Sequence, residues 1–179
     1  MTVHLILGGA RSGKSSYAET LLLNEQGNRH RHYVATAQVF DEEMSRRVAH
    51  HRQRRRNNWQ EHECPYDLPS LLARFTHNDI VLVDCLTLWM NNVIYNHGET
   101  ASEAQIRSQV SQLVDALNKS TATFVIVSNE VGLGVIPMGE VTRLFVDHAG
   151  WMNQAVAKVA ENVTFIAAGL PMQLKGAHG

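Results

Sequence analysis

The sequence predicts a single α/β domain, residues 1–179, with a mostly parallel central sheet and helices on both faces. Three observations predict it. The strand candidates are continuous apolar runs, helical stretches alternate with them from end to end, and no linker, repeat or low-complexity segment separates domains. Strands that are apolar throughout are buried on both faces, which is typical of a parallel sheet covered by helices. A length of 179 residues also suits one domain.

The first half of the chain contains four expected strands and three expected helices. The strands are short apolar or alternating runs: Val3–Leu7, His32–Thr36, Asn58–Cys64 and Ile80–Asp84. The helices are expected where apolar residues recur at helical spacing: from Lys14 to about Asn24, from Asp41 to about Arg54, and from Asp67 through Phe75. Asp41 can cap the second of these helices.

The second half continues the alternation. Ser102-x-x-Gln105 is typical of a capping box, and it begins a helix that directs Ile106, Val110, Leu113, Val114 and Leu117 inward. A further helix is expected within Gly139–Glu161, and the strands are Phe124–Ser128 and Val163–Ala168. The segment 96–102 is the most loop-like part of the middle of the chain.

Composition and charge narrow the function classes. Hydrophobic residues make up 44% and charged residues 18%, which fits a globular protein that needs no disulfide or metal to fold. Lys and Arg number 16 against 17 Asp and Glu, so the net charge of −1 argues against a general nucleic-acid binder. Cys64 and Cys85 are too few for a disulfide framework, and we expect neither a signal peptide nor a membrane span. We expect a cytoplasmic protein.

A glycine-rich motif follows the first strand directly. Residues 8–15 read Gly-Gly-Ala-Arg-Ser-Gly-Lys-Ser and match G-x-x-x-x-G-K-S/T in full, between an apolar strand and a helix. Glycines allow backbone N–H groups to converge on phosphate oxygens, and the following helix directs its positive end at them. The motif predicts a P-loop that binds a nucleoside triphosphate through Gly8, Gly9, Ala10, Arg11, Ser12, Gly13, Lys14 and Ser15. Lys14 is expected at the β- and γ-phosphates, and the Ser15 hydroxyl at Mg²⁺.

Asp84 ends the strand Ile80–Asp84 and is the candidate second ligand of Mg²⁺. A buried strand that delivers a carboxylate beside the phosphates is the usual partner of a P-loop, and Mg²⁺ takes few protein oxygens. The alternative is that Asp84 caps a helix after the strand, with Thr87 nearby. Beside a P-loop we favour the metal role.

A nucleotide site alone does not define a reaction. A switch GTPase generally carries Asn-Lys-x-Asp after a strand, whereas Asn118-Lys119-Ser120-Thr121 lacks the Asp and precedes its strand. A motor acting on nucleic acid would need more than the basic cluster 52–56, which has no aromatic platform beyond Trp59. Because the switch GTPase and the motor both lack features that they need, we favour a transferase.

A second motif, His50-His51-Arg52-Gln53-Arg54-Arg55-Arg56, allows two interpretations. One is a solvated basic helix end. The other is a nucleophile: a neutral imidazole can attack the α-phosphorus of a nucleotide while guanidinium groups offset the phosphate charge. Chelation of one metal by both histidines is disfavoured because adjacent helical side chains lie about 100° apart. The pair His30-x-His32 is expected at the surface rather than as a metal ligand.

Further segments occur in a characteristic order. The P-loop is followed by Ala35-Thr36-Ala37, Asp41-Glu42-Glu43-Met44, and His50-His51 with Trp59. Later come Ser-Asn-Glu-Val-Gly-Leu-Gly-Val-Ile-Pro at 128–137 and Arg-x-Phe-x-Asp-x-x-Gly-x-x-Asn-Gln at 143–154. Over nearly the whole chain, this order resembles the bifunctional adenosylcobinamide kinase/adenosylcobinamide-phosphate guanylyltransferase family of cobalamin biosynthesis. Many families share the P-loop alone, but its combination with the paired histidines and the Asn-Glu-Val-Gly segment is specific.

The resemblance implies two reactions. ATP or GTP phosphorylates the aminopropanol hydroxyl of adenosylcobinamide. GTP then guanylylates a histidine with loss of pyrophosphate, and the GMP passes to adenosylcobinamide phosphate to give adenosylcobinamide-GDP. The resemblance also implies a RecA-like fold, Mg²⁺, and a homotrimer with sites near the subunit interfaces.

The family's functional residues carry over onto matching positions of this sequence. His51 is the expected guanylylated nucleophile, with His50 as the second choice. The expected nucleotide contacts outside the P-loop are Ala35, Thr36, Ala37, Arg52, Gln53, Arg54, Arg55, Glu63 and Asp84. Glu63 could accept hydrogen bonds from the guanine edge, although it could equally be an ordinary acid at a strand end. Asp84 stands where some relatives have Glu, and Arg56 where some have Pro.

Overall fold

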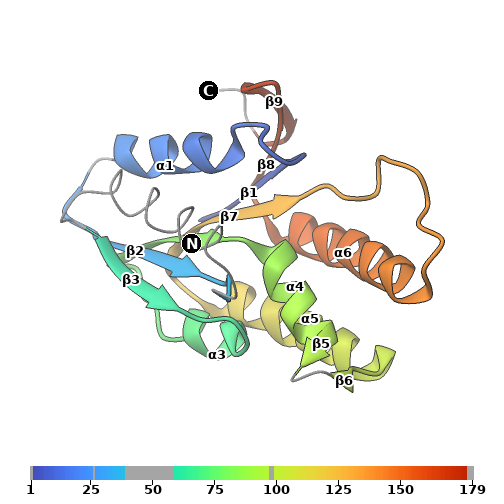
Figure 1. Ribbon diagram of the computed structural model, residues 1–179. Coiled ribbons are helices and arrows are strands. Elements are labelled where there is room, and N and C mark those ends of the chain that lie inside the picture. Colours follow the sequence, from blue (N-terminus) through green and yellow to red (C-terminus); the bar gives the residue numbers. More distant parts are fainter. Residues whose placement is uncertain (1, 26, 39–58, 97–98, 177–179) are drawn as a thin grey trace.

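The computed structural model describes residues 2–25, 27–38, 59–96 and 99–176 (Figure 1). Within them, seven strands form one sheet in the order β3-β2-β4-β7-β1-β8-β9. Their bounds are β1 (Thr2–Gly8), β2 (His30–Ala35), β3 (Trp59–Glu63), β4 (Asp79–Asp84), β7 (Thr123–Asn129), β8 (Asn162–Ala167) and β9 (Leu170–Lys175). Neighbouring strands are parallel except β8 and β9, which are antiparallel. The mostly parallel sheet is thus confirmed.

Helices cover both faces of the sheet, as expected. The described helices are α1 (Lys14–Asn24), α3 (Leu68–Leu72), α4 (Leu86–Ile94), α5 (Glu103–Lys119) and α6 (Glu140–Val159). Figure 1 shows α1 on one face and the other four on the opposite face. Among the described helices, none combines the length and the apolarity that crossing a membrane requires.

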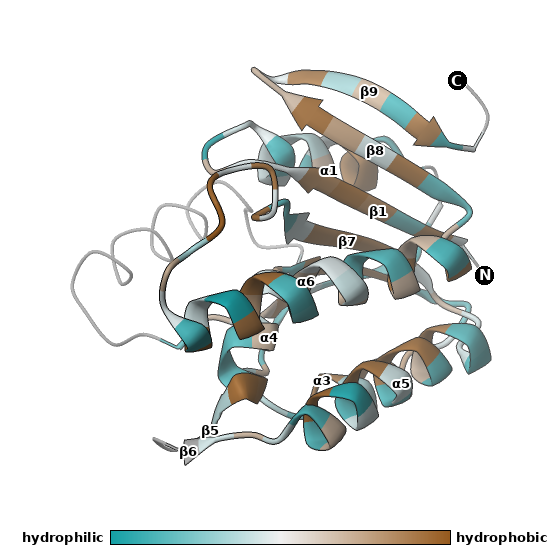
Figure 2. Ribbon diagram, turned by 90° about the vertical axis from the view of Figure 1, so that its right-hand side faces the viewer, coloured by the Kyte–Doolittle hydropathy of each residue, from teal (hydrophilic) through white to brown (hydrophobic). Residues whose placement is uncertain are grey.

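Strand β4 shows why the apolar runs are continuous. Ile80 and Leu82 belong to the core cluster that includes Leu22 of α1. Val81 and Val83 belong to the cluster on the other face, together with Trp89 of α4. Successive side chains of a strand point to opposite faces, so a strand between two helix layers needs an apolar residue at each position. Figure 2 shows the resulting apolar interior of the sheet.

The expected capping box of α5 is confirmed. Ser102 Oγ accepts a hydrogen bond from the Gln105 N–H at 3.3 Å, and Gln105 Oε1 accepts one from the Ser102 N–H at 2.8 Å. Ile106, Leu113 and Leu117 are buried on its inner side. The reciprocal pair satisfies two backbone donors that a helix N-terminus otherwise leaves unpaired.

Several elements differ from the prediction. The helix expected through Phe75 ends at Leu72, because Phe75 N–H bonds to Leu72 O, three residues back, and the chain tightens into a turn. Helix α4, the hairpin of β5 (Tyr95–Asn96) with β6 (Glu99–Thr100), and β9 were not expected. The helix expected from Asp41 to about Arg54 lies outside the described residues.

Candidate nucleotide site

The strand register brings most of the predicted site residues to one edge of the sheet. Gly8 lies opposite Asn129, and Ala35 lies opposite both Asp84 and Glu63. All of them are at the ends of parallel strands. The carboxyl edge is where open α/β sheets bind ligands.

The P-loop backbone depends on two of its glycines. A Cβ at Gly8 would lie 2.6 Å from both Ile166 O and Ser12 Oγ, so a side chain has no room there. Gly13 has φ +96° and forms the N-cap of α1, a conformation that side chains rarely adopt. Arg11, at φ 54°, also adopts a left-handed conformation. The loop therefore begins and ends at residues that only glycine fits well.

A distant turn supports this loop. Ala168 and Gly169 join β8 to β9 and both have positive φ, at 52° and 78°. Two such residues form the tight hairpin turn that matches strand twist. The Gly169 N–H donates to Ser12 O at 2.8 Å, so the hairpin fixes the P-loop from outside. This contact was not predicted, although Gly169, directly after the last expected strand, indicates a tight turn there.

Lys14 lies inside the cradle. Lys14 is 8% exposed, and its Nζ donates a hydrogen bond to Gly9 O at 2.8 Å. Burial lowers the pKa of Lys14, while the charges of Cys85 and Asp84 act to raise it. The Asp84 charge therefore reaches Lys14 even though β7 separates their strands. Ser12 Oγ is buried and has no hydrogen-bond partner within the described part of the chain, which suits a loop built to receive an anion.

Asp84 meets the requirements for holding Mg²⁺. It is half-buried at the end of β4, and the Tyr33 hydroxyl donates to its Oδ2 at 3.4 Å. The N-cap of α4 is Cys85, so the alternative in which Asp84 caps that helix is wrong. Carboxylate and hydroxyl oxygens are the donors that Mg²⁺ prefers, and Asp84 and Ser15 supply them near Lys14. The residues fit the metal.

Thr36 fastens β2 to the start of α4. Its residue is fully buried, and its hydroxyl donates to Cys85 O at 2.6 Å and accepts from Cys85 N–H at 2.9 Å. Asn92 Nδ2 donates to Thr36 O at 2.8 Å. The Thr36 side chain thus holds the backbone next to Asp84, and the half-buried Ala35 and Ala37 flank it.

Glu63 lies far from the P-loop along the same edge. It is exposed at the end of β3, which three strands separate from β1. Four strand spacings amount to about 19 Å. Glu63 lines a cavity of about 290 Å³ together with Cys64, Asp67 and Arg74. The other predicted residues, His50, His51, Arg52, Gln53, Arg54 and Arg55, lie outside the described residues.

A buried polar network at the end of β7 was not predicted. The Asn129 N–H donates to Thr87 Oγ1 at 2.6 Å, and Asn153 Nδ2 donates to Asn129 O at 3.2 Å. Ser128 Oγ also donates to Asn153 Oδ1 at 2.7 Å. Asn129 Oδ1 is buried without a partner in the described regions. Asn153 therefore positions the strand end, and Asn129 is a further candidate site residue at the carboxyl edge, as its place just after a buried strand indicates.

Sequence comparison identifies the family. The model of the cobinamide kinase / cobinamide phosphate guanyltransferase family matches residues 4–174. The chain belongs to this family. The bifunctional adenosylcobalamin biosynthesis protein CobP of Pseudomonas aeruginosa is 44% identical over 173 residues, which cover 96% of each chain. The bifunctional adenosylcobalamin biosynthesis protein CobU of Escherichia coli K12 is 35% identical, covering 96% of this chain and 98% of that protein. The corresponding Salmonella typhimurium protein is 34% identical with the same coverage.

Membership in the cobinamide kinase / cobinamide phosphate guanyltransferase family confirms the resemblance and the two activities that it implied. Solved structures support the fold. An ATPase domain of known structure has a TM-score of 0.50 at 11% identity, over 92% of this chain and 68% of that one. A protein from Pyrococcus horikoshii OT3 has a TM-score of 0.55 at 8% identity, over 99% and 87%. At such low identities the likeness concerns the fold alone, and it agrees with the expected P-loop architecture.

Proposed function

We propose that this chain phosphorylates adenosylcobinamide with ATP or GTP and then transfers GMP from GTP, through a GMP–histidine intermediate, to adenosylcobinamide phosphate. Both reactions belong to one domain, residues 1–179. The observation that carries the proposal is the P-loop with its buried Lys14 within electrostatic reach of Asp84, at one edge of a parallel sheet, in a chain of a bifunctional family.

The kinase step uses the P-loop edge. The aminopropanol hydroxyl attacks the γ-phosphorus, the bond to the β,γ-bridging oxygen breaks, and the hydroxyl loses its proton. Lys14 and the backbone N–H groups of 9–15 offset the charge on the β- and γ-phosphates. Ser15 and Asp84 would hold Mg²⁺, which neutralises phosphate charge when it is bound. Thr36 holds the backbone of Cys85, which follows Asp84, in place. Thr36 and its neighbours Ala35 and Ala37 would contact the nucleotide.

The guanylyltransferase step uses the histidine motif. An imidazole nitrogen of His51 attacks the α-phosphorus of GTP, pyrophosphate leaves, and the ring gives up its N–H proton. An oxygen of adenosylcobinamide phosphate then attacks the same phosphorus, and the N–P bond breaks to give adenosylcobinamide-GDP. Arg52, Gln53, Arg54 and Arg55 would contact the nucleotide, with the arginines offsetting its charge, and Glu63 would accept hydrogen bonds from guanine.

Labelled GTP tests the histidine assignment. The full chain is incubated with Mg²⁺ and GTP labelled at the α-phosphate, and the protein is then treated with acid or base. A phosphoramidate predicts label that is lost in acid and kept in base. His51→Ala should abolish labelling and keep kinase activity, whereas His50→Ala should keep both, and Lys14→Ala should impair both reactions.

Other outcomes would contradict the proposal. If the His51→Ala variant were still labelled and the His50→Ala variant were not, His50 would be the nucleophile. Absence of label from the wild-type chain would favour a protein that only senses nucleotides. Phosphoryl transfer that adenosylcobinamide fails to stimulate would favour a kinase for another small molecule.

We also propose that the chain forms a homotrimer. Leu133, Val135, Ile136 and Met138 are between 78% and 97% exposed, in the segment between β7 and α6 (Figure 2). Monomers rarely expose contiguous apolar patches of this kind, which usually mark interaction sites. The segment starts at the carboxyl edge, so a neighbouring subunit docked there would lie near the nucleotide site.

A further inference from the structure

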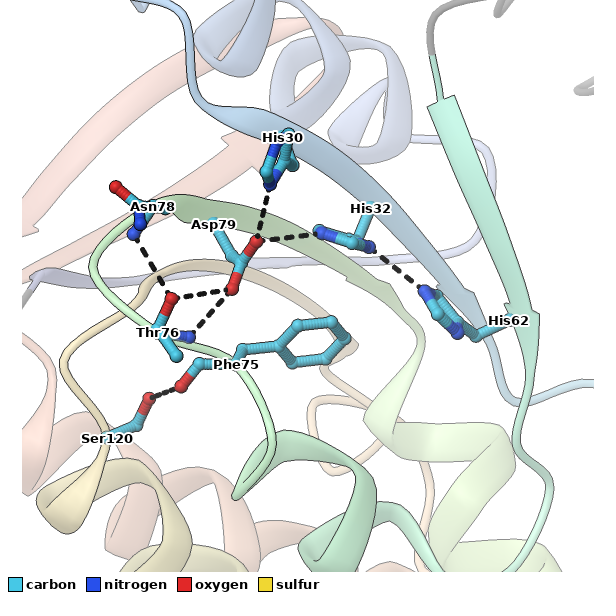
Figure 3. A network of polar contacts seen from close by, with 8 residues as sticks. All are labelled: His30, His32, His62, Phe75, Thr76, Asn78, Asp79 and Ser120. Carbon is cyan, nitrogen blue, oxygen red and sulfur yellow. Dashed lines mark hydrogen bonds and ion pairs between the residues drawn. The ribbon is translucent and has the colours of Figure 1, made fainter.

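A cluster of three histidines and an aspartate lies at the other edge of the sheet (Figure 3). His30 and Asp79 begin the parallel strands β2 and β4 and lie opposite each other in the register. His32 is on the same face of β2, and His62 is on β3. The surface position expected for the His30-x-His32 pair is right for His30 but wrong for His32, which is 6% exposed. From His30, at the start of β2, the strand runs six residues to the nucleotide edge, about 16 Å. His62 lies nearer that edge, because it directly precedes Glu63.

Three side chains of the cluster present their ligand atoms to one another. Asp79 Oδ1 lies 3.1 Å from His32 Nε2 and 3.4 Å from His30 Nδ1. The three atoms all lie within 4.8 Å of one another. Ligand atoms about 2.0–2.1 Å from a tetrahedral Zn²⁺ are about 3.3 Å apart, so both aspartate–histidine distances already match. The His30 side chain is 65% exposed, so its ring has room to turn toward His32.

Other residues hold the second carboxylate oxygen of Asp79 and the second ring nitrogen of His32. Thr76 donates to Asp79 Oδ2 from its backbone N–H at 2.8 Å and from its hydroxyl at 3.0 Å. His32 Nδ1 lies 3.0 Å from His62 Nε2, and the His32 ring packs against Phe75 at 4.7 Å between centroids. Such contacts, which fix the ring and carboxylate orientation, are typical of the residues around metal-binding histidines. They hold His32 Nε2 and Asp79 Oδ1 beside each other, 3.1 Å apart.

We propose that His30, His32 and Asp79 bind a divalent transition-metal ion, of which Zn²⁺ fits best, with solvent completing the coordination. Two imidazoles and a carboxylate suit Zn²⁺, whereas Mg²⁺ and Ca²⁺ take oxygen ligands. The His30 side chain is 65% exposed, which leaves the ion an entry path. The ion joins the first residues of β2 and β4, and through His62 it orders β3. Its role is to hold this edge together, apart from the phosphate chemistry.

Protonation distinguishes the metal-bound cluster from a hydrogen-bonded one. Without metal, His32 Nε2–H can donate to Asp79 while His32 Nδ1 accepts from His62. When a metal takes Nε2, the proton must sit on Nδ1, which then donates to His62 Nε2. Both arrangements give each ring nitrogen of His32 a partner.

A Zn²⁺ titration tests the proposal. The full chain is stripped with a chelator, dialysed, and titrated with Zn²⁺ against a chromophoric indicator. We expect one site at micromolar free Zn²⁺ or below, weakened at least 10-fold in His30→Ala. His77→Ala is the matched control, because His77 is an exposed histidine on the turn before β4 and lies outside the cluster. A double variant, His50→Ala with His51→Ala, should keep the site.

Two further readouts keep the test decisive. Co²⁺ should give the intense visible absorption of a four-coordinate site in the wild-type chain and in His77→Ala, but not in His30→Ala or Asp79→Asn. Zn²⁺ should raise the thermal unfolding midpoint of the wild-type chain and of His77→Ala, but not of the other two variants, since a ligand stabilises the state that binds it. Equal Zn²⁺ affinity of His30→Ala and His77→Ala, or failure of the wild-type chain to bind Zn²⁺, would overturn the proposal.

Discussion

At the scale of single residues, His148 is the clearest buried titratable group outside the two sites. It is 2% exposed on α6, and its ring packs edge-on against Trp151 at 5.1 Å. Its Nε2 is buried and makes no hydrogen bond to any described residue. Burial lowers the pKa of His148, Glu103 and Asp147 oppose that shift, and Arg107 adds to it. The folded chain therefore keeps this ring neutral to lower pH than the unfolded chain does.

His148 should make the fold sensitive to acid. Its ordinary pKa is 6.5, so the stability that its neutral form provides is complete above pH 6.5 and is lost as pH falls through the lower folded-state pKa. The loss can amount to at most about 1.4 kcal/mol per pH unit. Urea unfolding of the wild-type chain and of His148→Phe, measured from neutral pH down to about 5, should show a smaller loss in the variant. An equal loss in both proteins would contradict this account, and His77→Gln serves as the control.

Functional residues could be predicted from the sequence where they lie close together along the chain. The P-loop needs one strand, one turn and one helix, all within 24 residues of the start, so spacing alone indicated it. Asp84 was predictable because it ends an apolar run. The His32–Asp79 pair was not, since its partners are 47 positions apart and only the parallel register of β2 and β4 brings them together. The contact between Gly169 and Ser12 depends on a hairpin at the other end of the chain.

At the scale of elements, the P-loop offers a matched pair of glycines. A Cβ at Gly8 would lie 2.6 Å from the Ile166 backbone oxygen, in the neighbouring strand β8. A Cβ at Gly9 would meet nothing within 4 Å. Gly8→Ala must push β1 and β8 apart or displace Ser12, whereas Gly9→Ala adds only a solvent-facing methyl group.

Gly8→Ala should therefore destabilise the fold by about 1–3 kcal/mol, the usual range for overpacking. Gly9→Ala should leave the free energy of unfolding within about 0.5 kcal/mol of wild type. Urea denaturation without nucleotide measures both, because nucleotide would add its own stabilisation. If Gly8→Ala and Gly9→Ala had the same urea midpoint, the predicted steric clash at Gly8 would be contradicted.

The elements that were missed lack the patterns on which the prediction depended. Helix α4 buries six of its nine residues, and two of these, Thr87 and Asn92, are polar, so the hydropathy of its sequence does not separate the buried face from the exposed one. Strand β9 is mostly exposed and contains Pro171, which is typical of an edge strand but weakens a strand pattern. By contrast, α5 carries both a capping box and a one-sided apolar stripe, and its start was predicted to the residue.

At the scale of the whole molecule, the sheet separates two kinds of chemistry. Phosphate-binding residues gather at the carboxyl ends of the strands, and the proposed metal ligands at the amino ends of two of them. Metal at the amino edge would stabilise the sheet without competing for Mg²⁺ at the P-loop, because the two donor sets prefer different ions. The exposed segment 133–138, which follows the carboxyl edge, is the part of this surface best suited to contact another subunit.

Ile136→Glu should break the proposed trimer. Its side chain is 78% exposed and lies among apolar neighbours, so a carboxylate there costs the single chain little but must be desolvated in an interface. Analytical ultracentrifugation should give the wild-type protein a mass three times that of the 20.0 kDa chain and the variant a lower mass. Leu23→Glu, at a 58% exposed position on α1, is the control and should remain trimeric. A monomeric wild-type chain would refute the trimer, and an Ile136→Glu variant of unchanged mass would place the interface on another surface.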